Sequence, residues 1–204
     1  MRSVFLLSIL LLFTVHAVAA PMKFADHNFS MEMPPGWSTL TPQPADTLLA
    51  MQSPGRAQKL LVYAMTRPAR NHPDAARELG ENAKKGMTKA GYQIGPDQST
   101  TIGDLPFVFF TARVPDGGTM AAYIGSAGDE IYMMEGISKD KDADSEPQLQ
   151  AALRSFRLLS PPGAFHAPPS AHRSSNHLYL LVIATIVVIG IAGLTFRRLM
   201  AKEQ

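Results

Sequence analysis

The sequence predicts an α+β domain in which an antiparallel sheet packs between helices, followed by one C-terminal transmembrane helix. Three observations lead to this fold class. Seven short stretches have strand composition, and each is bounded by Gly, Pro, Asp or Asn. Two longer stretches space their apolar residues three and four apart, as helices with one buried face do. Near the C-terminus, residues 178–196 form an apolar run without a charge.

The predicted strands lie on both sides of the first predicted helix. They cover residues 29–33, 46–52, 59–66, 99–102, 107–114, 119–125 and 131–138. Segments 115–118 and 126–129 both contain Gly and Asp, and glycine accepts the positive φ that tight turns need. We therefore predict that the last three strands form an antiparallel meander.

The first helix is predicted at residues 73–90. Pro73 suits the first turn, and Gly91 suits the position just past the end. The predicted apolar stripe consists of Ala76, Leu79, Ala83, Met87 and Ala90. A helix with one such stripe must cover a sheet face.

The second helix is predicted at residues 146–158, with Asp144 or Ser145 as the cap at its start. Its apolar side consists of Leu149, Ala152, Leu153 and Phe156. Because the chain alternates groups of strands with single helices and has hairpin turns, the class is α+β and not a doubly wound nucleotide-binding fold.

The stretch Phe29–Trp37, "FSMEMPPGW", combines a strand with a rigid turn. Phe29, Met31 and Met33 alternate with polar residues and are predicted to face the core. Pro34-Pro35-Gly36 then turns the chain, and we expect Trp37 to fold back over the end of the core.

This strand and its "P-x-G-W" turn resemble the start of PsbP-like domains, a group that includes Mog-type Ran-binding proteins and bacterial DcrB-like proteins. The resemblance covers about residues 22–160 and extends to the helix at 73–90, the late hairpins and the terminal helix "LQAALRSF". It implies an antiparallel sheet between helices and a binding or assembly role without chemistry of its own. Because members of the group differ in partner, it implies no particular partner.

The two ends of the chain predict the cellular location. Residues 1–19 are assigned as a secretory signal peptide, because Arg2 precedes a short apolar core and small residues at 17 and 19 form a cleavage site. The alternative is an uncleaved N-terminal anchor. However, this apolar core is shorter than the roughly 20 residues that a membrane span needs.

Residues 178–196 are predicted to be a transmembrane helix, and residues 197–204 a basic tail. Arg197, Arg198 and Lys202 follow the span directly, so the positive-inside rule places the C-terminus in the cytoplasm. The signal peptide places the domain at 22–160 on the other side. The prediction is a single-pass protein of the cell membrane with an extracytoplasmic N-terminal domain.

Residues 161–177 connect the domain to the span and are rich in Pro, Ser and His. Such a composition cannot bury enough apolar surface to fold alone, so it predicts a linker. His166, His172 and His177 leave a metal site open as an alternative, although their spacing is not that of a regular ligand set.

The sequence assigns no catalytic, cofactor-binding or metal-binding residue. Cysteine is absent, and no nucleophile-elbow, zincin, P-loop or dinucleotide motif occurs. The domain contains two histidines, His27 and His72, and neither belongs to a recognisable catalytic pattern. Hydrophobic residues make up 46% and the net charge is only +2, which favours neither a disordered chain nor a nucleic-acid partner.

Two features leave a metal-binding alternative open. Asp140, Asp142 and Asp144 alternate as in the first half of a calcium loop, but Ser145 replaces the required Gly and Ala151 the closing Glu. A solvated loop before a helix explains the same residues. The many methionines, Met31 and Met33 among them, are soft ligands that suit copper(I), although methionine at strand spacing is typical of a core.

Charge is distributed unevenly along the domain. Residues 56–89 contain eight Lys or Arg against three acids, and residues 97–146 contain three against ten. The first helix carries Arg77, Lys84, Lys85 and Lys89. These cations predict either a surface for an acidic partner or lipid headgroups, or an ordinary solvated helix face.

Together, these features predict a non-catalytic binding or assembly module for a protein partner, held at the membrane by one span. The alternatives are a metal-binding or metal-delivery module and, third, a hydrolase whose residues form no known motif.

Overall fold

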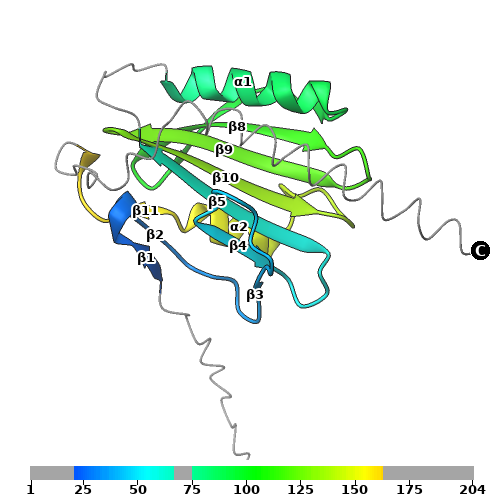
Figure 1. Cartoon of the computed structure of the whole chain (residues 1–204), viewed down its shortest axis with the longest axis horizontal. Helices are drawn as coiled ribbons and strands as arrows, with labels where there is room; N and C mark the ends of the chain where they lie inside the picture. Colours follow the sequence, from blue (N-terminus) through cyan, green and yellow to red (C-terminus); the bar gives the residue numbers. More distant parts are fainter. Residues whose placement is uncertain (1–20, 67–74, 163–204) are drawn as a thin grey trace, which may run out of the picture.

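The computed structural model describes residues 21–66 and 75–162, and its largest element is an eight-stranded antiparallel sheet (Figure 1). The order across the sheet is β3-β4-β5-β10-β9-β8-β6, and β7 also pairs with β8. The bounds are β3 Ser38–Thr39, β4 Leu49–Gln52, β5 Gln58–Thr66, β6 Gln93–Ile94, β7 Gln98–Ile102, β8 Leu105–Arg113, β9 Thr119–Ala127 and β10 Glu130–Ser138.

Three further strands form a small antiparallel sheet in the order β1-β2-β11, with β1 at Met22–Phe24, β2 at Phe29–Met31 and β11 at Arg157–Leu158. A single turn of 3-10 helix, Ala25–His27, links β1 to β2. Helix α1 spans Ala75–Lys89 and helix α2 spans Pro147–Arg154. Figure 1 shows α1 on one side of the large sheet, and α2 and the small sheet on the other.

The large sheet buries apolar side chains on both faces, because consecutive residues of a strand point to opposite sides. On the α1 side, Leu61 and Met133 pack with Leu79 and Met87 of the helix. On the α2 side, Met134 packs with residues of α2 and the small sheet. The predicted α+β architecture, an antiparallel sheet between helices, is thus confirmed for the described residues.

The predicted turn after the first strand is confirmed. The Trp37 amide donates to the Pro34 carbonyl at 3.3 Å, and Gly36 has a φ of +79°, which a type II turn requires at this position. Trp37 is 8% exposed and belongs to the core on the α2 side. Its indole Nε1 donates to Gln148 Oε1 at 3.2 Å, so the turn fixes the start of α2.

Helix α1 confirms its predicted stripe, since Leu79, Ala83 and Met87 are buried. Its end is also as expected. The Gly91 amide donates to the Thr88 carbonyl and the Tyr92 amide to the Met87 carbonyl, both at 3.0 Å, which is the Schellman pattern. Pro73 lies outside the described residues.

Helix α2 is shorter than predicted. It ends at Arg154 instead of continuing to 158, because Arg157 and Leu158 pair with β2 as strand β11. Neither Asp144 nor Ser145 caps its start. The N-cap position is Glu146, without a side-chain cap, and Pro147 occupies the first turn.

The close approach of α2 to the sheet depends on Gly136 in β10. A Cβ atom there would lie 2.8 Å from side-chain atoms of Leu149 and 3.0 Å from Leu153. Any larger residue at this position would therefore push α2 away from the sheet.

Asn28 closes the small sheet. Its side-chain Oδ1 accepts hydrogen bonds from the amide and the hydroxyl of Ser160, at 2.9 and 2.7 Å, and its Nδ2 donates to the Ser160 carbonyl at 3.0 Å. The first and last segments of the domain are therefore held side by side.

Several predictions fall on residues outside the described ranges: the signal peptide at 1–19, most of the linker at 161–177, the span at 178–196 and the tail at 197–204. Within the described ranges, neither α1 nor α2 is long and apolar enough to cross a membrane.

Candidate functional site

The edge of the large sheet at β6 and β7 is interrupted by a β-bulge. Gln93 and Ile94 lie opposite Arg113 and Ala112, and the Gly95 amide donates to the Thr111 carbonyl at 2.8 Å. Pairing then resumes with Gln98 opposite Phe109. The edge strand therefore has residues 96 and 97 where β8 has only residue 110. One extra residue in one strand defines a bulge, and bulges keep an edge from pairing with further strands.

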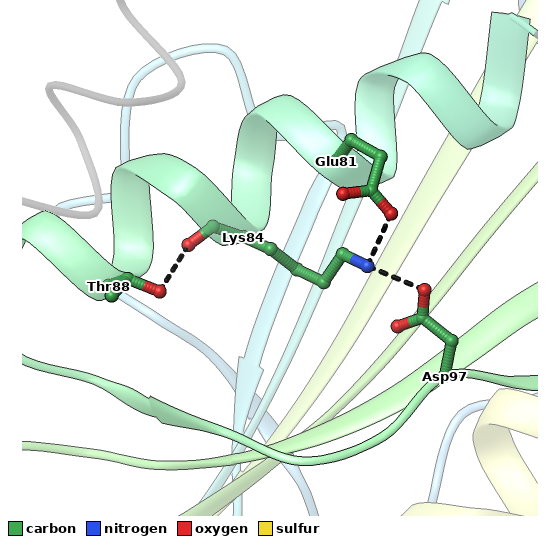
Figure 2. A network of polar contacts seen from close by, with 4 residues as sticks. All are labelled: Glu81, Lys84, Thr88 and Asp97. Atoms are coloured by element: carbon green, nitrogen blue, oxygen red, sulfur yellow. Dashed lines mark hydrogen bonds and ion pairs between the residues drawn. The ribbon is translucent and has the colours of Figure 1, made fainter.

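The bulge supplies Asp97 to helix α1. Lys84 Nζ donates to Asp97 Oδ2 at 2.5 Å and to Glu81 Oε1 at 2.6 Å, so that one ammonium group bridges the helix and the edge strand (Figure 2). Partial burial lowers the pKa of Lys84, but the hydrogen bonds and charges of Asp97 and Glu81 outweigh it and leave the pKa above its ordinary value.

A solvent-open groove of about 600 Å³ runs between α1 and this edge, and we call it the α1 groove. The helix contributes Glu81, Lys84, Lys85, Thr88 and Lys89, and the edge contributes Ile94, Gly95, Pro96 and Asp97. Lys85 and Lys89 are exposed. The lining contains three lysines and two acids, so the net charge of the groove is +1.

A second hollow, of about 300 Å³, is lined by Ile94 and Gly95 as well. Its other walls are formed by β8 and β9, with Thr111, Arg113 and Thr119, and by the loop at 142–144. The bulged edge thus borders two hollows. Neither hollow could be predicted from local sequence patterns, because the bulge depends on the register with β8.

The acidic loop before α2 is anchored to strand β9 by Thr119. Thr119 Oγ1 accepts from the Ala143 amide at 2.7 Å and donates to the Lys141 carbonyl at 2.9 Å. Asp142 and Asp144 are exposed. Among the described residues, no three His, Asp or Glu side chains are grouped to hold a metal ion.

The proposed copper ligands are core residues. Met31 is fully buried with Phe29 and Phe156 on the α2 side, and Met33 packs against the same cluster. The linker histidines His166, His172 and His177, and also His72, lie outside the described residues.

His27, the remaining histidine of the domain, belongs to a small polar cluster. Its Nδ1 lies 3.2 Å from Glu130 Oε2, and Glu130 is completely buried. The Thr66 hydroxyl donates to the other carboxylate oxygen of Glu130. The Tyr132 hydroxyl donates to the His27 carbonyl at 2.9 Å. Sequence reasoning missed this cluster because its members are up to 105 residues apart.

Glu135 is a second buried carboxyl of β10, on the α1 side of the sheet. It lies opposite Leu61 of β5 and Ala122 of β9, and it is 2% exposed. Within the described residues, its Oε1 atom has no hydrogen-bond partner. Burial raises the pKa of Glu135 to about 7.

Two tyrosines lie within electrostatic range of Glu135. Burial, followed by the charge of Glu135, raises the pKa of both Tyr63 and Tyr92. Glu135 lines neither the α1 groove nor the second hollow, and we regard it as a core residue.

The predicted basic surface on α1 is confirmed only in part. Lys85 and Lys89 are exposed, whereas Lys84 is neutralised by Glu81 and Asp97. Arg77 is exposed and engages in an interaction of its own. The positive charge is therefore concentrated at the C-terminal half of the helix.

The described residues have a PsbP-like fold, as the resemblance in the sequence implied. It is similar to the solution structure of cyanobacterial PsbP (CyanoP) from Synechocystis sp. PCC 6803, with a TM-score of 0.54 and 12% sequence identity. The match covers 70% of this chain and 93% of that protein. At this identity, the similarity establishes the fold alone.

A crystal structure from Bacteroides thetaiotaomicron VPI-5482 is also similar, with a TM-score of 0.50 and 12% identity. The match covers 69% of this chain and 48% of that protein, so the chain spans about half the length of this second relative. No protein-family model matches the sequence, and no curated protein matches it significantly.

Proposed function

We propose that this protein is a non-catalytic binding or assembly module of the PsbP-like group that engages a protein partner outside the cytoplasm. The observation that carries the proposal is the bulged edge at β6 and β7, with a hollow on either side. The bulge limits self-association, because it prevents further strands from pairing with this edge. The two hollows offer contacts for the side chains of a partner.

The proposal includes a membrane anchor. It is supported by the apolar, charge-free stretch at 178–196, by the basic residues that follow it and by the signal-peptide pattern at 1–19. In this arrangement, the domain lies on the extracytoplasmic side of the cell membrane at the end of the linker.

Affinity capture with the full-length, membrane-embedded chain tests this function. We expect a protein partner that is recovered in constant ratio and is competed by the untagged chain. The test variant combines Arg113→Glu in the second hollow with Thr88→Glu in the α1 groove. It should recover less of the partner than the wild-type chain does. Tight stoichiometric binding of Ca²⁺ or Cu⁺ by the purified chain, with no partner captured, would contradict the proposal in favour of a metal module.

A further inference from the structure

We propose that the α1 groove binds an acidic segment of the protein partner, with Lys85 and Lys89 receiving its carboxylates. This inference rests on the proposed function, and it adds the chemistry of the partner and the surface that recognises it.

The two lysines are placed to act together. Lys85 and Lys89 are four residues apart on α1 and therefore lie on the same side of the helix. Both are exposed, and within residues 21–66 and 75–162 neither has an acidic partner within ion-pair distance. Like charges at this spacing repel each other. A carboxylate that binds between Lys85 and Lys89 would reduce this repulsion.

The acids of the groove are already in use. Both Glu81 and Asp97 contact the ammonium group of Lys84, whose side chain is only 16% exposed (Figure 2). This triad ties the helix to the bulged strand, and its two carboxylates pair with Lys84 and not with the outer lysines. The triad has a net charge of −1 and the two outer lysines add +2, so the groove as a whole has a net charge of +1.

The wall of the groove opposite α1 is apolar, so a bound segment should also place an apolar side chain there. Ile94 is half-buried and Pro96 is exposed, and both line the groove. Pro96 has no amide hydrogen, and the bulge breaks the ladder beside it, so a bound peptide cannot continue the sheet here. Recognition must come from side chains: acids on the lysines and an apolar residue against Ile94 and Pro96.

A protein segment fits this groove better than a membrane surface does. A plane of lipid headgroups attracts protruding cations and needs no groove. A groove with two lysines on one wall and apolar residues on the other suits a peptide that carries both acidic and apolar side chains. Exposed pairs contribute little each, so the contact is a weak and salt-sensitive one.

The test uses the full-length chain in detergent micelles and a short synthetic peptide with glutamates on both sides of one phenylalanine. The control peptide has glutamine in place of each glutamate. The chain variant is Lys85→Gln with Lys89→Gln. Its matched control is Lys139→Gln with Lys141→Gln, because these lysines are also exposed and the change in net charge is the same.

We expect the acidic peptide to shift amide resonances of residues 84–97. We further expect the α1 double variant to bind it about fivefold more weakly, as the loss of two exposed ion pairs implies, while the loop double variant binds normally. Thr88→Glu, which adds a negative charge between the two lysines, should weaken binding as well.

Three results would overturn the inference: equal weakening in both double variants, equal binding of the glutamine peptide, or binding of phosphatidylglycerol vesicles that depends on Lys85 and Lys89 when the peptide does not bind. The proposed function is tested separately. If the captured partner is retained by the α1 double variant, the function stands and this surface is wrong. If the wild-type chain captures no partner, the function itself fails.

Discussion

Strand β10 buries two glutamates in opposite ways. Glu130 faces the small sheet, and both of its carboxylate oxygens are contacted, by Thr66 and by His27. Glu135 faces the α1 side among apolar neighbours, with one oxygen that lacks a partner in the described residues. Both side chains are at most 2% exposed. The same residue type in the same strand is thus buried once with contacts to both oxygens and once with an oxygen that lacks a hydrogen-bond partner.

The difference shows what decides the state of a buried carboxyl. Burial removes water from both carboxyls, and at Glu130 hydrogen bonds to both oxygens replace the lost water contacts. Glu135 has no such donor on Oε1, and its pKa is raised to about 7. Changing each glutamate to glutamine should therefore have opposite consequences.

The largest effect is expected for Glu135→Gln above neutral pH. A carboxyl whose pKa is raised from 4.5 to about 7 on folding binds a proton more tightly when folded. The stability that it contributes is complete below pH 4.5 and is lost as the pH rises through about 7. The difference in unfolding free energy between variant and wild type should therefore move by about 3 kcal/mol in favour of glutamine across this range.

Urea unfolding followed by the fluorescence of Trp37, the single tryptophan of the chain, measures this difference. At any single pH, the difference in unfolding free energy between variant and wild type also includes the cost of burying the amide of glutamine. The informative quantity is therefore the change of this difference with pH. A difference that stays constant between acidic and alkaline pH would show that folding does not raise the pKa of Glu135.

Glu130→Gln is expected to destabilise the fold by about 1.5–3 kcal/mol at neutral pH, the usual contribution of hydrogen bonds to a charged group. The amide nitrogen of glutamine donates where one carboxylate oxygen accepted, so the hydrogen bond with Thr66 or that with His27 must reverse its direction or is lost. The same urea experiment gives the value. Stability equal to wild type would mean that the cluster contributes nothing to folding.

His27→Ala should destabilise the fold by about 1 kcal/mol, less than Glu130→Gln, because Thr66 still satisfies one oxygen of the buried carboxylate. Combining His27→Ala with Glu130→Gln in a double-mutant cycle isolates their interaction. Strict additivity would contradict the direct contact between the two side chains.

The smallest effect is expected for Asp97→Asn, below about 1 kcal/mol, because the ion pair with Lys84 is partly exposed. The loss should shrink further in high salt, unlike that of Glu130→Gln, which concerns a buried group. Thermal unfolding at two salt concentrations separates the two cases.

Much of the fold could be predicted from the sequence. The long strands β5, β8, β9 and β10 were visible because their composition and their Gly-containing turns are local signals. Helix α1 was visible because its stripe repeats over four turns. The strands β1, β3, β6 and β11 were missed, since each is two or three residues long and is defined by its partner strand.

The predicted end of α2 was wrong for the same reason. Phe156 continues the apolar spacing of the helix, yet Arg157 and Leu158 pair with β2, more than a hundred residues earlier in the chain. Periodicity shows which side of a residue is buried, but not which element covers it.

The candidate site could be predicted only as far as its lysines. The clustering of the lysines on one helix can be read from the sequence, whereas the pairing of Lys84 with Asp97 cannot. It requires the bulge at residues 96 and 97, which turns Asp97 toward α1 (Figure 2). If the edge strand paired with β8 one residue out of register, this contact would be lost although the sequence would be the same.

The pairing of β11 with β2 has a mechanical consequence. A pull on the C-terminal side of the domain reaches Ser160 first, and its load passes through three hydrogen bonds to Asn28 and then through a strand of two residues. These few bonds would separate under force before the nine-residue strands of the large sheet do. Stretching would thus detach the last segment while the surface around α1 keeps its shape.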